Sequence, residues 1–114
     1  MAVATVVIRQ GISSDSVVSG KYTCDSSLTA TPINVGFVPS VVLVWNATDG
    51  DIMSLFSTDM TADKGIKIST AASTMASGGI TLNAQTGGTN LGFTVGTDAG
   101  VQEASKVFGF LAFK

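Results

Sequence analysis

The sequence predicts an all-β protein: a small antiparallel β-sandwich, jelly-roll-like, with about eight short strands. The first observation behind this prediction is composition, because Gly, Ser and Thr are abundant whereas Leu, Glu, Lys and Arg are sparse. Such a composition disfavours long helices and favours strands joined by tight turns. The second observation is that short apolar runs recur between turn signals, as is typical of a sandwich or a barrel.

The candidate strands follow one another along the whole chain. At 114 residues the chain is expected to form one domain, 1–114, that buries roughly two-thirds of its unfolded surface. Apolar runs place strands at 2–9, 16–19, 31–37, 41–46, 52–56, 66–70, 79–83, 91–95 and 106–113. Glycine-containing turn signals lie at 49–50, 64–65, 77–79 and 97–100, and Pro39 favours an extended chain before the strand at 41–46. The small-residue segments 71–79 and 85–90 are expected to be exposed loops.

Two segments depart from this simple pattern. Met53, Phe56 and Met60 recur at helical spacing, whereas residues 52–56 also alternate in part, so a short helical turn at 57–63 stays open beside a purely extended chain. Residues 1–30 are the most polar long stretch once the opening strand is passed. They are a candidate extended arm that contacts neighbouring molecules.

Three candidate strands are apolar on both faces, although a strand with one solvated face should alternate apolar and polar residues. The opposed sets are Val107, Leu111, Phe113 against Phe108, Phe110, Ala112; Val41, Leu43, Trp45 against Val42, Val44; and Ala4, Val6, Ile8 against Val3, Val7. One such strand could be covered by a helix or loop, or could cross the middle of the fold. A chain of this size has too few residues to cover three such strands in this way. We therefore expect a partner interface. Its candidate residues are Val3, Val6, Ile8, Phe108, Phe110 and Phe113.

Groups that perform enzyme chemistry are scarce in this chain. It contains no His, one Cys and only 12% charged residues, so triads that need histidine cannot form. Cys24 precedes Asp25, whose negative charge disfavours a thiolate, which predicts a structural thiol. Aspartates at 49, 51, 59 and 63 lack the continuation of a calcium-binding loop. We expect no enzymatic activity, no catalytic residue, no cofactor and no bound metal.

Charge and hydropathy narrow the class of partner. Six basic residues stand against eight acidic ones, the pI is about 4.6, and the basic residues are scattered, which argues against nucleic acid. No apolar run approaches the ~20 residues that span a bilayer, so no membrane partner is expected. The opening residues 1–9 lack the basic and long apolar regions of a secretory leader. A lone Cys24 excludes an internal disulfide, which fits a reducing compartment.

Two segments carry a family resemblance. Residues 36–50 read GFVPSVVLVWNATDG and residues 92–101 read GFTVGTDAGV, ahead of the aromatic strand at 106–113. Together they resemble small virion proteins of tailed bacteriophages, over about a third of the chain. The shared positions look like turn and core positions: Gly36 and Gly92 before a buried Phe, Pro39 opening a strand, and Thr97-Asp98 in a turn. The family offers no catalytic residues to carry over.

The resemblance implies a capsid decoration (cement) protein, a structural virion component that binds the outside of a phage head and stabilises the shell. Its implied partners are the major capsid protein and copies of itself, as a homo-dimer or trimer. Its implied location is the capsid surface of the virion, after assembly in the host cytoplasm. One alternative is a phage tail or fibre component that uses loops 71–79 and 85–90 to bind a receptor. A second is a carbohydrate-binding β-sandwich module, although such modules usually expose several aromatics and Trp45 is the chain's single tryptophan.

Overall fold

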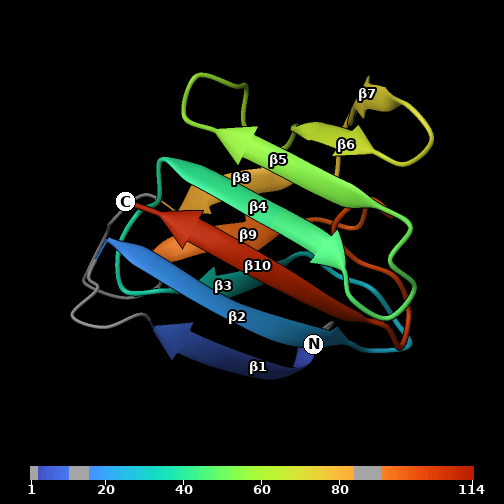
Figure 1. Cartoon of the computed structure of the whole chain (residues 1–114), viewed down its shortest axis with the longest axis horizontal. Helices are drawn as coiled ribbons and strands as arrows, with labels where there is room; N and C mark the ends of the chain where they lie inside the picture. The colour runs from blue at the N-terminus through green and yellow to red at the C-terminus, as the bar shows by residue number, and fades with distance from the viewer. Residues whose placement is uncertain (1–2, 11–15, 84–90) are drawn as a thin grey trace.

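The computed structural model describes residues 3–10, 16–83 and 91–114 (Figure 1). In these ranges there is no helix. The strands are β1 (Val3–Gln10), β2 (Val17–Cys24), β3 (Thr31–Asn34), β4 (Val41–Asn46), β5 (Met53–Ser57), β6 (Ile66–Ile68), β7 (Ala72–Thr74), β8 (Ile80–Asn83), β9 (Gly92–Val95) and β10 (Val107–Phe113).

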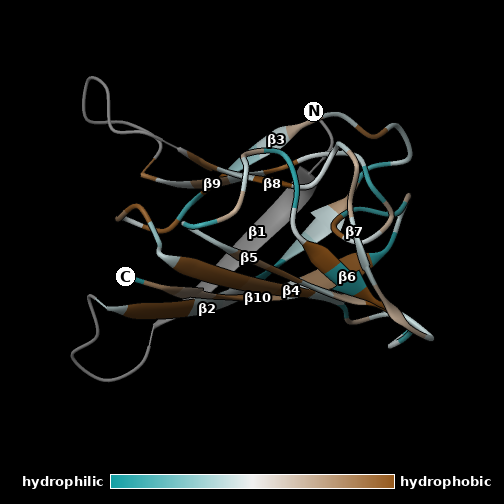
Figure 2. Ribbon diagram, turned by 90° about the horizontal axis from the view of Figure 1, so that it is seen from above, coloured by the Kyte–Doolittle hydropathy of each residue, from teal (hydrophilic) through white to brown (hydrophobic). Residues whose placement is uncertain are grey.

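The strands form two antiparallel sheets that pack face to face, which confirms the predicted β-sandwich. The larger sheet has seven strands in the order β1-β2-β10-β4-β5-β6-β7, and the smaller has the order β3-β9-β8. Figure 2, a view from above, shows β3, β9 and β8 in one layer and β2, β10, β4 and β5 in another. Early strands pair with late ones, β2 with β10 and β3 with β9, in a jelly-roll-like manner. The meander from β4 to β7 makes the two sheets unequal.

Most predicted strands lie where the apolar runs indicate, and β4 has the predicted bounds 41–46. Two strands differ most in length from the prediction. β2 runs to Cys24 instead of ending at residue 19, because β10 pairs with residues 17–23 despite Gly20 and Lys21. β3 ends at Asn34 instead of residue 37, because the Asn34 side chain accepts a hydrogen bond from the Gly36 N–H (3.1 Å) and Gly36 takes a φ of 91°.

Three other expectations need correction or fall outside the structure. The segment 57–63 forms turns and not a helical turn, with Met60 N–H bonded to the Ser57 carbonyl (3.0 Å). The predicted loop 71–79 contains β7 and the buried Met75, and residues 85–90 lie outside the described ranges. Within the candidate arm 1–30, β1 and β2 are neighbouring strands of the large sheet, and contact of this stretch with neighbouring molecules stays a prediction.

The core lies between the two sheets and is built around four aromatic side chains. The ring of Tyr22 stacks on Phe108, with centroids 5.7 Å apart, and Phe93 of the small sheet meets Phe110 edge to face at 5.5 Å. All four side chains are completely buried. Burial of a large apolar side chain contributes about 1.5–3 kcal/mol, so this cluster is a main source of stability. Gly92 lets β9 approach β3, since a Cβ there would meet the Ile33 carbonyl oxygen.

The connection from β9 to β10 is fastened to the core by buried hydrogen bonds. The Tyr22 hydroxyl donates to the Val101 carbonyl, and Ser54 Oγ donates to the Gly100 carbonyl (2.8 Å). Gln102 Nε2 donates to the carbonyls of Thr29 (2.7 Å) and Gly96 (2.9 Å). The bonds to the Val101, Gly100 and Gly96 carbonyls are buried, so they satisfy acceptors that water does not reach.

A Tyr22→Phe variant tests this fastening through the pH dependence of stability. Burial, together with the nearby Cys24, raises the pKa of Tyr22 well above its ordinary value of about 10. The neutral phenol therefore stabilises the fold below about pH 10, and this contribution is lost as the pH rises towards the folded-state pKa. Tyr22→Phe should lower the free energy of unfolding by about 1–3 kcal/mol at neutral pH, because the Val101 carbonyl loses its donor. The difference from wild type should shrink in alkali, as measured by denaturant unfolding.

Tyr22 is the only tyrosine in the chain, so the ultraviolet absorbance of tyrosinate reports on it alone. An absorbance titration of the folded protein with a midpoint near pH 10 would contradict the buried, hydrogen-bonded hydroxyl.

Candidate interaction surface

The structure separates the six residues expected at an interface. Phe108 and Phe110 have an exposed fraction of 0% and point into the core, so the expectation that they contact a partner is wrong for these two residues. Their role is to pack the two sheets together. Phe113 is half-buried on the opposite face of β10. Val3, Val6 and Ile8 belong to β1, whose side chains lie outside the described part of the structure.

The face of the large sheet that points away from the small sheet, here called the outer face, carries most of the remaining apolar side chains. The register arranges them in rows across β2, β10, β4, β5 and β6. The middle row is Ser19, Leu111, Leu43, Leu55 and Ile66. The row on one side is Lys21, Gly109, Trp45, Met53 and Ile68, and on the other side Val17, Phe113, Val41 and Ser57.

These outward side chains are only partly shielded by one another. Met53 and Ile68 are exposed, at 41% and 47%, and the leucines of the middle row are half-buried. Among the described residues, no further layer covers this side of the sheet (Figure 2). A soluble monomer seldom exposes a contiguous apolar patch of more than a few hundred Å². The outer face is therefore the candidate site of interaction.

Trp45 lies flat against the sheet instead of projecting from it. A Cβ placed on Gly109 would lie 2.5 Å from Cε2 and Nε1 of the indole, so the ring rests directly on the β10 backbone. Glycine at position 109 is what allows this contact. Beside Trp45, a shallow hollow of about 320 Å³ is bordered by Met53, Ile68 and the turn residues Gly50 and Asp51.

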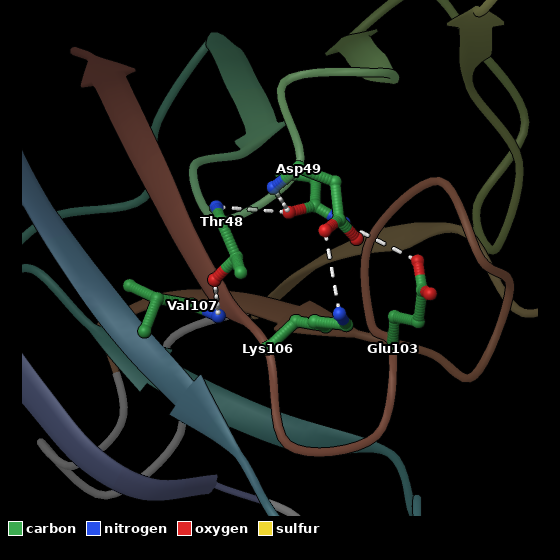
Figure 3. A network of polar contacts seen from close by, with 6 residues as sticks. Thr48, Asp49, Glu103, Lys106 and Val107 are labelled. Atoms are coloured by element: carbon green, nitrogen blue, oxygen red, sulfur yellow. Dashed lines mark hydrogen bonds and ion pairs between the residues drawn. The ribbon is translucent and has the colours of Figure 1, made fainter.

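A polar network holds the turn between β4 and β5 at one end of the outer face (Figure 3). Asn46 Oδ1 accepts hydrogen bonds from the N–H groups of Thr48 (3.0 Å) and Asp49 (2.9 Å), and its Nδ2 donates to Glu103 (3.2 Å). Lys106 forms an ion pair with Asp49 at 3.3 Å. The Asn46 side chain is 1% exposed, so its hydrogen bonds are protected from water. The network fixes the turn to the start of β10.

A second polar turn organises residues 97–100. Asp98 Oδ1 accepts the Gly100 N–H (2.8 Å) and binds Lys67 Nζ (3.0 Å), which ties this loop to β6. Both segments that carry the virion resemblance thus contain an Asn or Asp that shapes a turn. Phe37 and Phe93, which follow Gly36 and Gly92, are buried as expected.

Reactive groups do not gather on the described surface. Cys24 is buried, and desolvation is the main cause that raises the pKa of its thiol. A backbone hydrogen bond with Glu103 lowers this pKa, whereas the charges of Asp25 and Glu103 raise it. A raised pKa makes the thiol a poor nucleophile at neutral pH. Within residues 3–10, 16–83 and 91–114, no three His, Cys, Asp or Glu side chains are grouped as a metal site would require. The same residues include no helix long and apolar enough to span a membrane.

Sequence analysis missed the contribution of β5 and β6 to this surface. Leu55, Met53 and Ile68 join the outer face only because β5 pairs with β4 and β6 pairs with β5. The alternation within 53–57, with Ser54 and Phe56 inward, is the local signal that could have placed the outward residues.

Comparisons with family models, with curated proteins and with solved structures return no match to this chain.

An Asn46→Ala variant should show how strongly the β4–β5 turn depends on its buried side chain. Removing the amide leaves two backbone N–H groups and Glu103 without their partner, so the free energy of unfolding should fall by about 1–3 kcal/mol. Asn34→Ala is a matched control, because Asn34 makes a similar turn bond at an exposed position. Denaturant unfolding should give a clearly smaller loss for Asn34→Ala. Equal losses would contradict the importance of burial.

A Gly109→Ala variant should lift the indole of Trp45 from the sheet. The new Cβ would occupy the space of the ring, so the side chain must move into solvent, at a cost of about 1–3 kcal/mol in stability. Trp45 is the only tryptophan, so its fluorescence should shift to longer wavelength and be quenched more easily by iodide. Thr23→Ala, on β2 of the same face, is the control and should leave the emission unchanged. An unchanged emission in Gly109→Ala would contradict the contact.

Proposed function

We propose that this chain is a structural virion protein, a capsid decoration (cement) protein that binds the outside of a phage head and stabilises the shell. The observation that carries the proposal is the outer face, a sheet surface with apolar rows that a freely diffusing protein would keep polar. The resemblance of residues 36–50 and 92–101 to small virion proteins supports the same function.

The mechanism is mechanical. A sandwich with an interlocked aromatic core is a rigid body, so it can bury surface against neighbours without first becoming ordered. Each copy that bridges shell subunits adds a modest free energy of binding, and many copies acting together resist the pressure of packaged DNA. This work needs no proton transfer or nucleophile, which agrees with the burial of Cys24 and Tyr22.

The two resemblance segments support the proposal through the scaffold. Asn46 shapes the turn at the end of β4, a strand of the outer face, and Asp98 shapes the turn after β9 and binds Lys67 of β6. Gly92 permits the close pairing of the small sheet. These residues maintain the shape of the sandwich. Proteins that share them would have the same fold, even where the residues of their contact surfaces differ.

The number of copies per particle tests this function. Phage particles from the strain that encodes the chain would be purified and analysed by quantitative mass spectrometry against the major capsid protein. A decoration protein should be present in hundreds of copies, and heads that lack it should release DNA at a lower temperature until purified chain is added back. A handful of copies would favour the tail or fibre alternative, and absence from particles would reject both.

A matched pair of variants tests whether the outer face is the surface that phage particles require. Leu111→Lys places a charge in the middle row of the outer face, and Val38→Lys places the same charge at an exposed apolar residue outside it. We expect Leu111→Lys to reduce occupancy on particles at least tenfold and Val38→Lys to retain it. Equal occupancy of both variants would show that the outer face is not needed in the virion.

A further inference from the structure

We infer that the outer face packs against the outer face of a second copy of this chain, forming a two-fold symmetric dimer. The inference deepens the proposed function, on which it rests, by naming a second copy of the chain, and not the shell, as the molecule that contacts the outer face. A charge on that face would then lower occupancy on particles by weakening the dimer. It commits to one occupant of the surface, another molecule of the same protein, on the basis of charge, shape and area.

Charge favours a copy of the chain as the partner. In the described rows of β2, β10, β4, β5 and β6, Lys21 is the one charged side chain, and it lies at the β2 side. A partner that used charged residues would leave them unpaired against such a surface, which is costly on burial. Self-packing brings no like charges together at the centre. Strongly apolar interfaces are characteristic of homodimers.

Shape also favours packing of sheet on sheet. Trp45, the bulkiest side chain of the face, lies on Gly109 and so does not obstruct a flat approach. Two sheets pack about 10 Å apart when their facing side chains interdigitate. The hollow beside Trp45, bordered by Met53 and Ile68, offers space for a side chain of the opposing sheet.

Area predicts a reversible dimer. Five strands about 4.8 Å apart, with three rows of outward side chains about 7 Å apart, give a face of about 24 by 20 Å, or about 500 Å². Two such faces bury about 1,000 Å² in total, which is near the lower limit of a specific interface. We expect a weak, reversible dimer, because interfaces near this limit are characteristic of transient complexes.

The strand order and register also identify the residue nearest the two-fold axis of the proposed dimer. β4 is the third of the five strands, and the row of Leu43 is the middle of the three rows. Any two-fold axis in the plane of the interface that passes through its centre therefore brings Leu43 close to Leu43 of the second copy. Because Leu43 would face itself, a charged residue at position 43 should repel its copy in the second molecule and weaken the dimer.

Sedimentation velocity on the purified full chain, from about 1 to 500 µM, tests the dimer. Wild type should change from monomer to dimer across this range. Leu43→Lys and Leu43→Glu should each remain monomeric, with at least a tenfold weaker association, and the control Val38→Lys should dimerise as wild type does. Thermal unfolding of each variant at low concentration checks that it folds. If a charged variant fails to fold, Leu43→Thr replaces it and should still weaken the dimer.

Mixing the two charged variants gives the sharper result. If Leu43 faces Leu43, equal amounts of Leu43→Lys and Leu43→Glu should form a mixed dimer that neither variant forms alone. High salt should weaken it.

Several outcomes would overturn the inference. A wild type that stays monomeric up to 500 µM would do so, as would a trimer or open polymer, a dimer that survives both charged variants, or no dimer on mixing. A monomer that nevertheless binds phage heads would leave the proposed function standing and assign the face to a shell protein. A dimer absent from particles would support this inference and reject that function.

Discussion

The structure depends above all on the position of β10 between β2 and β4. All seven residues of β10 pair with β2, and six of them also pair with β4. Its inward residues Phe108 and Phe110 fill the core, and its outward residues Leu111 and Phe113 build the outer face. A one-residue slip in this register would exchange the two sets and spoil both surfaces at once.

The surrounding polar groups act to hold that register. Thr48 Oγ1 accepts the Val107 N–H (2.8 Å), and the Cys24 N–H binds the Lys106 carbonyl (2.9 Å), so β10 is fixed at its start by both neighbours. The buried bonds of Tyr22 and Gln102 position the loop that leads into it. The exposed ion pair of Lys106 and Asp49 contributes little free energy by comparison.

Sequence analysis predicted the fold class well because local signals are strong in this chain. Turn glycines and apolar runs placed β4 at its observed bounds, and the opposed faces of β10 were correctly separated into two sets. The pattern could not predict which of the two sets of β10 side chains faces the small sheet, because both sets are apolar. That ambiguity put Phe108 and Phe110 at a predicted interface. The outward role of Leu55 and Ile68 depends on pairings between strands, which no single segment reveals.

The place of β10 in the chain has a consequence for the timing of assembly. β10 follows all nine other strands in sequence, yet it lies inside the large sheet and not at its edge. During synthesis, therefore, β2 and β4 are made before the strand that lies between them. Neither the core nor the outer face is complete until β10 has been made. A growing chain in which β10 has not yet been made does not possess the finished surface. Any contact through that surface therefore requires that β10 has first been inserted between β2 and β4.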